Sequence, residues 1–276
     1  MADLSIVIVS FDTAGELQDC LASLRDHPPA EPHDIVVVDN ASTDGTADRV
    51  RADWPEVRLI VSPRNVGFAA GNNLGIRAVD SEFVLLLNSD TLVPAGAIDA
   101  LIGELRRQPA LAAIGPRIVD PHGHVELSFG PMMGPLNELR QKLLVTLHAR
   151  RVRAISRLVE RRTSRPQRPD WVSGACLLVR HADAMAAGLL DERYFLYAED
   201  VDFCAALRAL GKAIGFTPAA EIVHLRGASR RKRPDAAEHA YRRSQIAFYE
   251  KHHPGWAGVL RLYLRLRGKR PPERSA

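Results

Sequence analysis

Short apolar runs alternate with segments of helical periodicity through the first half of the chain. The runs lie at residues 4–11, 34–39, 57–61, 83–87 and 112–119. The fourth run contains five apolar residues without alternation, which is typical of a strand buried on both faces of a parallel sheet. Because strands alternate with helices, the pattern predicts an α/β fold in which helices flank a mostly parallel central sheet.

Polar side chains follow two of these runs at the point where each predicted strand ends. Asp39 ends the second run, and Asn88, Ser89 and Asp90 follow the fourth. The carboxyl ends of parallel strands meet at one edge of the sheet, where α/β proteins bind ligands, so we expect Asp39 and Asp90 to face the same crevice. Carboxylates there suit a ribose hydroxyl or a divalent cation. An ordinary polar turn is the alternative interpretation of the Asn-Ser-Asp triplet.

Helical segments are predicted near both ends of the chain and in its middle. Thr13 and Glu16 fit a capping box that opens a helix ending near Arg25. Residues 136–168 have apolar positions at near-helical spacing and arginines on other faces, which predicts a basic amphipathic helix. Such a helix either lies on anionic lipid or packs on the protein's own sheet, and both interpretations stay open. Residues 259–267 alternate like a strand but also fit a helix, which we favour.

The second half also predicts strands and an acidic helix start. Residues 171–179 indicate one strand kinked at Gly174, where a ligand or another backbone segment can approach closely. Residues 212–224 indicate one or two short strands. Glu199 and Asp200 open a predicted helix, whose dipole favours acidic side chains, so a purely structural role is one interpretation of this pair.

Composition is ordinary for a globular protein, but the charge is distributed unevenly. The 276 residues are 46% hydrophobic and 25% charged. Residues 1–130 contain nine basic and 19 acidic side chains, whereas residues 131–276 contain 28 and 14. A basic half indicates contact with phosphates, nucleic acid or a membrane surface. The run at 230–233 is a candidate diphosphate clamp, or a solvated face. Because no nucleic-acid motif or interleaved aromatic platform is present, we expect no nucleic acid partner.

Other features of the sequence indicate the cellular compartment and disfavour some classes of nucleotide-binding site. The three cysteines, Cys20, Cys176 and Cys204, are far apart in sequence and indicate buried thiols in a reducing compartment. The first residues lack the basic start of a signal peptide, and no apolar run has the length of a membrane span. We expect a cytoplasmic protein, and peripheral contact with the inner face of the cell membrane is compatible with this expectation. Neither a GxGxxG nor a GxxxxGK[ST] motif is present, which disfavours dinucleotide and P-loop sites.

Three motifs together resemble the family 2 glycosyltransferases. They are Val-Val-Asp-Asn-Ala-Ser-Thr-Asp-Gly at 37–45, Asn-Val-Gly-Phe-Ala-Ala-Gly-Asn at 65–72 and Leu-Asn-Ser-Asp at 87–90. The resemblance covers roughly residues 4–230 and is strongest to a rhamnosyltransferase-like bacterial branch. It implies a GT-A fold and an inverting enzyme that uses nucleotide-activated sugars.

The resemblance assigns the donor site to the ends of the first strands. Asp39, Asn40 and Ser42 are expected at the nucleoside, and Ser10 is expected to line the same pocket. The full set of expected nucleotide-sugar ligands is Ser10, Asp39, Asn40, Ser42, Asn65, Gly67, Asn72, Asn88, Ser89 and Gly174.

The resemblance also implies a metal and a catalytic base. The Asn-Ser-Asp triplet stands for the family's DxD motif, so Asp90 is expected to bind Mg²⁺ or Mn²⁺. His224 opens a stretch similar to the family's His-x-x-Gly-x-Ser and is a second candidate metal ligand, although a lone histidine at a strand end is more often structural. Glu199 and Asp200 match the family's acidic pair, with Asp200 as the base. This agrees with inverting transfer, in which one carboxylate takes the acceptor proton.

The expected organisation follows from these assignments. Residues 1–130 form the nucleotide-sugar-binding α/β half. Residues 131–235 form the acceptor and catalytic half of the same GT-A domain, with a basic helical insertion at about 136–168. Residues 236–276 form a helical, basic tail.

We therefore expect an inverting glycosyltransferase of cell-surface polysaccharide synthesis. It would move a sugar, with L-rhamnose as one candidate, from a dTDP-, UDP- or GDP-sugar to a glycan or lipid-linked glycan. A nucleotidyltransferase and a non-catalytic sugar-nucleotide-binding or nucleic-acid-binding protein stay open as alternatives.

Overall fold

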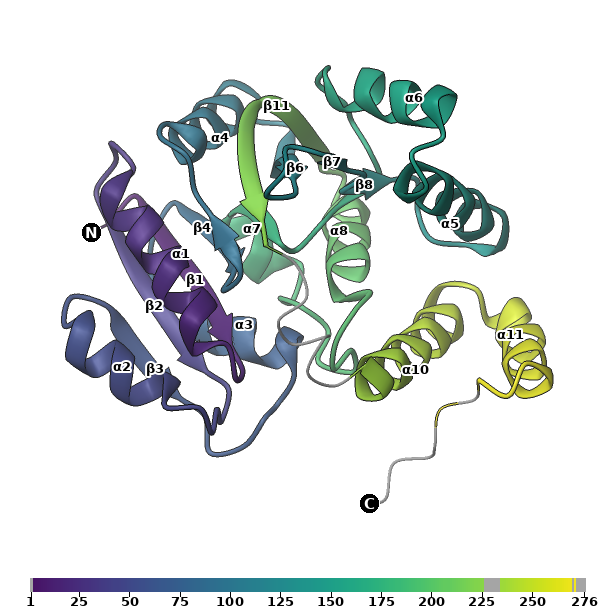
Figure 1. Cartoon of the computed structure of the whole chain (residues 1–276), viewed down its shortest axis with the longest axis horizontal. Helices are drawn as coiled ribbons and strands as arrows, with labels where there is room; N and C mark the ends of the chain where they lie inside the picture. The colour runs from purple at the N-terminus through teal and green to yellow at the C-terminus, as the bar shows by residue number, and fades with distance from the viewer. Residues whose placement is uncertain (1, 226–233, 270, 272–276) are drawn as a thin grey trace.

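A computed structural model describes residues 2–225, 234–269 and 271 (Figure 1). The described strands are β1 (Leu4–Ser10), β2 (His33–Asp39), β3 (Arg58–Val61), β4 (Phe83–Asn88), β5 (Thr91–Leu92), β6 (Leu111–Val119), β7 (Val125–Glu126), β8 (Phe129–Gly130), β9 (Trp171–Val172), β10 (Cys176–Arg180) and β11 (Ala213–His224). The described helices are α1 (Ala14–Asp26), α2 (Thr46–Asp53), α3 (Phe68–Arg77), α4 (Ala97–Arg107), α5 (Pro135–Ala149), α6 (Arg153–Thr163), α7 (His181–Ala186), α8 (Glu199–Ala209), α10 (Pro234–His252) and α11 (Pro254–Leu266).

One mixed sheet organises the molecule, with the strand order β3-β2-β1-β4-β10-β6-β11-β5 and with β7 paired to β6. The pairs β3–β2, β2–β1, β1–β4 and β6–β11 are parallel. β10 runs antiparallel to both β4 and β6. The prediction of a mostly parallel sheet flanked by helices is confirmed, with β10 as the antiparallel strand that separates its two parallel parts.

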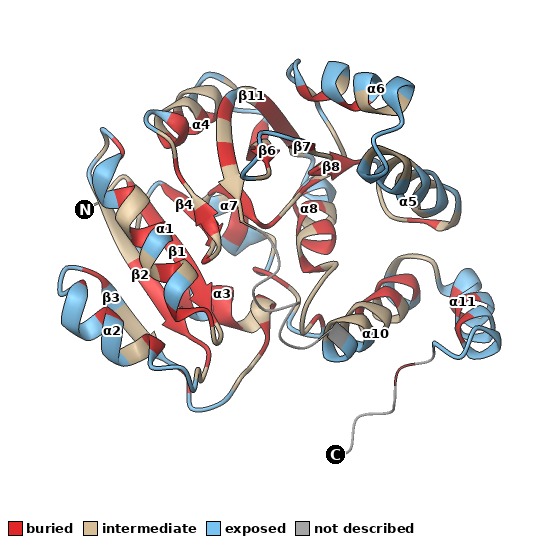
Figure 2. Cartoon of the chain, in the orientation of Figure 1, coloured by how far each residue is buried: buried red, intermediate tan, exposed pale blue. Residues whose placement is uncertain are grey.

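The apolar run of β4 is buried because helices cover both faces of the sheet (Figure 2). Phe83, Leu85 and Leu87 belong to the hydrophobic cluster that includes apolar residues of α1 and α4. Val84 and Leu86 belong to a second cluster, which includes residues of α3, α7 and α8. Successive residues of a strand point to opposite faces, so a strand with a core on each side has no polar position.

The strand ends meet at one edge of the sheet, as predicted. In the parallel register, Ser10 lies beside Asp39, and Val9 lies beside Asn88. The ends of β1, β2 and β4 therefore bring Ser10, Asp39 and the turn after Asn88 to the same side of the molecule.

The prediction of one strand over 171–179 is wrong. β9 pairs with β8 in a separate two-stranded sheet, and β10 belongs to the main sheet. Between them, the Gly174 backbone N–H donates to Asp200 Oδ2 (2.9 Å), and Ala175 O accepts from the Asn88 N–H (2.9 Å). The chain changes sheets here because it turns to contact the start of α8. By contrast, residues 213–224 form a single strand, β11, with a register shift between Thr217 and Glu221.

The predicted capping box at Thr13 is also wrong, although the helix that it predicts is present. Thr13 makes no side-chain cap hydrogen bond to α1. Its Oγ1 instead contacts Ser10 Oγ and Ser89 Oγ, each at 2.9 Å. Asp44 Oδ2 accepts a hydrogen bond from the Ala14 N–H (2.9 Å) and so satisfies a donor at the helix start.

The basic insertion forms two helices rather than one, because the chain turns at Arg151 (φ 57°) between α5 and α6. α6 packs on the protein, since its Val159 is buried with Val119 and Val125. α5 has no buried residue. Residues 254–266 form a helix, as predicted. Among the described residues, none of the helices combines the length and the apolar character that a membrane span requires.

Candidate active site

The turn after β2 is held by a bond within the turn at Asp39 and by bonds to the loop after β1. Asp39 is 2% exposed, and its Oδ1 accepts from the Ser42 N–H (3.1 Å). Ser42 Oγ accepts from the Asp12 N–H (3.0 Å), and Asp12 Oδ1 accepts from the Thr43 N–H (2.7 Å). The loops after β1 and β2 therefore brace each other, and the Ser42 hydroxyl, expected at the nucleoside, takes part in this brace.

Asn40, Asn65 and Gly67 form one connected loop structure. Asn40 Nδ2 donates to Asn65 Oδ1 and to Gly67 O, both at 3.1 Å, and its Oδ1 accepts from the Val66 N–H (2.9 Å). Gly67 has φ +90°, and a Cβ there would lie 2.5 Å from Phe195 O. A side chain at Gly67 would thus push away the segment that leads into α8. Asn40, Asn65 and Gly67 thus use these atoms to hold the shape of the loop.

A chain of hydroxyl groups joins the end of β1 to the turn after β4. Ser10 Oγ contacts Thr13 Oγ1, which contacts Ser89 Oγ, and all three residues are buried. Thr13 was not among the predicted site residues, because its position suggested a helix cap. The network fixes Ser89, and with it the turn that carries Asp90.

Asp90 and His224 lie together, although 134 positions separate them in sequence. His224 Nε2 is 3.2 Å from Asp90 Oδ1, and His224 Nδ1 is 3.5 Å from Glu126 Oε2. Burial alone would lower the pKa of His224, but the contacts with Asp90 and Glu126 outweigh burial and raise the pKa to about 9. β5 makes this possible by pairing antiparallel with the end of β11, so that His224 lies beside Thr91. Glu126, on the short strand β7, has no motif in the sequence that identifies it.

Two of the predicted site residues have a buried amide oxygen without a partner within the described ranges. Asn88 Oδ1 and Asn72 Oδ1 have no hydrogen-bond partner among the described residues. No cluster of three or more metal-ligating side chains is present in the described part of the chain. Glu126 and Asp90 contact opposite nitrogens of the His224 ring, so the three groups do not converge on one point. A divalent cation at this place would be held by Asp90 and one neighbouring side chain, and phosphate oxygens would supply the other ligands. This combination of ligands is typical of Mg²⁺ in phosphate-binding sites.

Asp200 is fixed in the first turn of α8. Its Oδ2 accepts from the Gly174 N–H (2.9 Å), and its Oδ1 accepts from the Val201 N–H (2.8 Å). A Cβ on Gly174 would lie 3.3 Å from Asp200 Cβ, so the close approach predicted at Gly174 is made by this side chain. Burial raises the pKa of Asp200, although the hydrogen bonds from Gly174 and Val201 act to lower it. A raised pKa makes the carboxylate a better proton acceptor.

The residues just before α8 adopt an unusual backbone. Tyr197 (φ 70°) and Ala198 (φ 65°) are both left-handed, a conformation that costs free energy for non-glycine residues and is enriched at functional sites. Ala198 is the N-cap residue and makes no side-chain cap bond, so α8 begins without a conventional cap. This conformation directs the first turn of α8, which includes Asp200, toward Gly174.

The other acids of α8 have different environments. Glu199 is 5% exposed, and its Oε2 has no hydrogen-bond partner among the described residues. Burial and the nearby Asp200 charge raise the pKa of Glu199 well above its ordinary value. Asp202 is 1% exposed and binds Lys251 Nζ (2.8 Å) and His252 Nε2 (2.6 Å). Asp202 therefore anchors α10, whereas Glu199 is a buried carboxyl group whose raised pKa favours its protonated form.

A cavity of about 310 Å³ joins the two parts of the site. Both Asp200 and His224 line it, so the carboxylate of α8 and the partner of Asp90 share one space. The remaining walls come from β7, β9, α5, α10 and the segments between them, and they include Glu126, Ser128, Met133, Asn137, Glu138, Gln141, Lys142, Trp171, Tyr197 and Tyr241. The predicted site set included none of these wall residues, because they come from segments without a recognisable motif.

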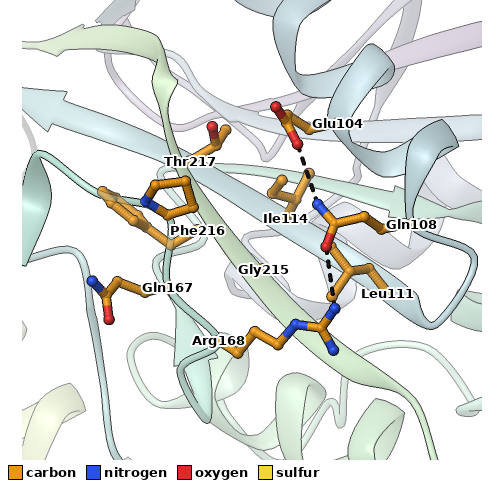
Figure 3. Close-up of a pocket in the computed structure, with 10 residues that line it drawn as sticks. Glu104, Gln108, Leu111, Ile114, Gln167, Arg168, Gly215, Phe216 and Thr217 are labelled. Carbon is orange, nitrogen blue, oxygen red and sulfur yellow. Dashed lines mark hydrogen bonds between the residues drawn. The ribbon is translucent and has the colours of Figure 1, made fainter.

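A second cavity, of about 260 Å³, lies between α4, β6, β11 and the segment at 166–168 (Figure 3). Gln108 bridges its polar groups, since it donates to Glu104 Oε2 and accepts from Arg168 Nη2, both at 3.2 Å. All predicted site residues are described in the structure, and none of them lines this cavity. The cavity shared by Asp200 and His224 is therefore the candidate active site. The predicted arginine-rich clamp at 230–233 lies outside the described residues.

Comparison with known proteins identifies the family. Residues 5–155 match the family model described as Glycosyl transferase family 2. The chain is 32% identical over 264 residues to the N-acetylglucosaminyl-diphospho-decaprenol L-rhamnosyltransferase of Mycobacterium tuberculosis, and the match covers 92% of this chain and 86% of that protein. The chain belongs to glycosyl transferase family 2. The family model includes Asp39 and Asp90 but ends before α8.

Solved glycosyltransferases share the fold. The mannosyltransferase PcManGT from Pyrobaculum calidifontis, in complex with GDP-Man and Mn²⁺, superposes with a TM-score of 0.62 at 17% identity, covering 94% of this chain and 68% of that one. GalNAc-T7, with UDP, GalNAc and Mn²⁺, gives a TM-score of 0.60 at 14% identity, covering 83% of this chain and 44% of that one. The chain thus has the GT-A fold predicted from its motifs.

Proposed function

We propose that this family 2 glycosyltransferase transfers L-rhamnose, with inversion, from a nucleoside diphosphate sugar to a polyprenyl-diphosphate-linked sugar. The 32% identical relative is named for that acceptor class and that sugar. One structural observation carries the proposal: Asp200 and His224, the partner of Asp90, line the same cavity. Donor and acceptor chemistry then meet in one space of about 310 Å³.

The donor nucleotide lies along the ends of β1, β2 and β4 in this proposal. Asp39 accepts hydrogen bonds from the nucleoside, and the braced loops around Asn40 and Gly67 hold it in position. The orphaned oxygens of Asn72 and Asn88 are further polar contacts for the donor or its cation. A pre-arranged loop binds its ligand at a lower cost in conformational entropy.

Asp90 would hold a divalent cation, Mg²⁺ or Mn²⁺. His224 would join it as a ligand only by releasing the proton that its contacts with Asp90 and Glu126 favour. Such an ion, when bound, neutralises the charge that develops on the departing diphosphate. Asp90 is suited to this role because its turn is fixed by the hydroxyl chain through Thr13 and Ser89.

Asp200 is the catalytic base. Its carboxylate takes the proton of the acceptor hydroxyl as that oxygen bonds to the anomeric carbon and the bond from that carbon to the diphosphate oxygen breaks. Burial and the charge of Asp200 favour the protonated form of Glu199, in which the two acids do not place adjacent negative charges in a buried site.

The acceptor sugar occupies the cavity between α5, α8 and α10. Trp171 and Tyr241 give apolar surfaces for a sugar ring, while Asn137 and Gln141 give hydrogen-bonding groups. A polyprenyl acceptor also implies that the enzyme works at a membrane surface.

Transfer to a synthetic acceptor tests the proposal. The protein is incubated with dTDP-, UDP- and GDP-sugars, an N-acetylglucosaminyl diphosphate with a short alkyl chain, and either Mg²⁺, Mn²⁺ or a chelator. We expect a new glycosidic bond of inverted configuration, formed only with metal, and fastest with dTDP-rhamnose. Donor binding without transfer to any acceptor would support a non-catalytic binder, and nucleotide incorporation would support a nucleotidyltransferase.

A further inference from the structure

α5 exposes a row of leucines to solvent. Leu136, Leu139 and Leu143 are 69%, 66% and 56% exposed, and three- to four-residue spacing places them on one side of the helix. Large apolar side chains gathered on an exposed helix face indicate a binding surface rather than chance exposure.

α11 has a similar apolar row. Trp256, Val259, Tyr263 and Leu266 are each more than half exposed and recur at helical spacing. The part of α11 that packs on the protein is different, because there the buried residues Ala257, Leu260 and Leu264 join the cluster of α10. The exposed row is therefore not needed for the packing of α11.

The two helices begin beside each other. His253, the N-cap residue of α11, contacts Met133 O through Nε2 (2.8 Å), two residues before α5 begins. Both helices lie at the same side of the molecule, where much of their surface is exposed (Figures 1 and 2).

The surroundings of these rows are strongly basic. Residues 134–168 contain ten basic and two acidic side chains, and residues 254–269 contain four basic and none acidic. Apolar side chains with basic neighbours, together with a Trp and a Tyr, are typical of helices that lie in the interface of an anionic membrane. A second copy of the chain would bring like charges together, so charge complementarity favours lipid.

We propose that these two rows form a docking surface for an anionic lipid bilayer, made of Leu136, Leu139, Leu143, Trp256, Val259, Tyr263 and Leu266. The inference deepens the proposed function, since it names where the membrane that carries the acceptor is bound. The opposite side of α5 bears Asn137, Glu138 and Gln141, which line the candidate active site. One helix thus contacts the lipid with one face and forms a wall of the acceptor cavity with the other.

Flotation with vesicles tests the docking surface. Wild-type protein is mixed with vesicles of phosphatidylcholine, with or without phosphatidylglycerol, at low and high salt. We expect it to float with the anionic vesicles and to be released as salt screens the charge. The double variants Leu139→Ser/Leu143→Ser and Val259→Ser/Leu266→Ser should each bind at least about tenfold more weakly, because burial of each apolar side chain contributes to the partition coefficient.

Charge variants and a control variant distinguish docking on lipid from non-specific adsorption to vesicles. Arg265→Gln and Arg267→Gln should each weaken binding to anionic vesicles about fivefold, without an effect on neutral vesicles. Met185→Ser, a change of a 51% exposed residue on α7, should bind as wild type does. Circular dichroism should show unchanged helix content in every variant.

Three results would overturn the docking surface: a wild-type protein that does not float, equal binding to neutral and anionic vesicles, or a Met185→Ser loss as large as that of the double variants. If the double substitutions instead dissociated a dimer of a protein that does not float, the occupant would be a second copy, and the docking surface would be wrong. Transfer to the short-chain acceptor needs no vesicle. A protein that floats but transfers nothing would therefore refute the proposed function alone.

Discussion

On the side of the site proposed to bind the donor, here called the donor side, the side chains at the ends of β1, β2 and β4 form hydrogen bonds with one another. For example, the side chain of Asn40 forms hydrogen bonds with Asn65, Val66 and Gly67. On the acceptor side, Asp200 is held by the backbone of Gly174, and the cavity walls come from α5 and α10, which pack against each other through Glu138. Hydrogen bonds between neighbouring loops thus fix the donor side, whereas packing between helices fixes the acceptor side.

The difference has a consequence for mutations. On the donor side, a substitution such as Asp39→Ala should remove a proposed ligand contact while the neighbouring residues keep their positions. A substitution that loosens α10 on the acceptor side moves a whole wall of the cavity. The variants below test this contrast, starting with the largest expected effect.

Asp90→Ala removes the carboxylate proposed to hold the cation. Because a bound cation supplies several kcal/mol to such a reaction and each 1.36 kcal/mol is tenfold in rate, transfer should fall by about 10³-fold or more. The melting temperature without ligands should fall modestly, because Asp90 also pairs with His224, and Mn²⁺ should no longer tighten nucleotide binding. Turnover near the wild-type rate would contradict the metal assignment.

Asp202→Asn tests the anchoring of α10. Removing a buried carboxylate that binds Lys251 and His252 should lower the free energy of unfolding by about 1.5–3 kcal/mol, measured by urea denaturation. Asp191→Asn is the matched control, since Asp191 also binds Lys251 but is more exposed, so its loss should be smaller. Equal effects of the two variants would show that burial of Asp202 contributes nothing extra.

Asp39→Ala should weaken nucleotide binding about tenfold or more, measured by calorimetry with nucleoside diphosphate, because a hydrogen bond to a charged group contributes about 1.5–3 kcal/mol. Ser42→Ala serves as the comparison. The Ser42 hydroxyl already accepts a hydrogen bond from the Asp12 N–H, so Ser42→Ala should lose less nucleotide affinity than Asp39→Ala. Unchanged affinity in Asp39→Ala would make Asp39 a structural residue.

The pH dependence of kcat/KM should show the raised pKa of Asp200. The deprotonated form is the base, so activity falls as pH drops through that pKa, and burial places this fall above the ordinary value of 3.8. An acid limb at the ordinary carboxyl value, measured over a pH series with saturating metal, would argue against a buried base.

The placement of the donor-side residues was largely predictable from sequence, because these residues lie in three short motifs at strand ends. Asp39 and Asp90 lie at one edge of the sheet, as predicted from parallel strands alone. The exception is Thr13, whose spacing to Glu16 predicts a cap but whose hydroxyl contacts the side chains of Ser10 and Ser89. The sequence around Thr13 cannot indicate a hydrogen-bond partner that lies 76 positions away.

The acceptor side was much less predictable. The resemblance to the family led to Asp200, yet nothing in sequence distinguished its environment from that of Asp202. The cavity walls from α5 and α10 are set by tertiary packing, for example by Glu138, which accepts hydrogen bonds from Tyr241 (3.0 Å) and Tyr249 (2.9 Å). The division of 136–168 into a docked α6 and an exposed α5 likewise depends on which residues find a core.

The most direct test of the central claim compares Asp200→Asn with Glu199→Gln. Asn keeps the size of the side chain and one acceptor oxygen but cannot take a proton, and general-base catalysis typically contributes about 10²–10⁴-fold. We expect transfer by Asp200→Asn to fall by that factor while donor affinity stays near wild type. The melting temperature should fall modestly, because one of the N–H donors of Gly174 and Val201 loses its acceptor. Glu199→Gln keeps the size of a side chain whose protonated form is favoured by burial, so this variant should stay active. A fully active Asp200→Asn enzyme would contradict the account.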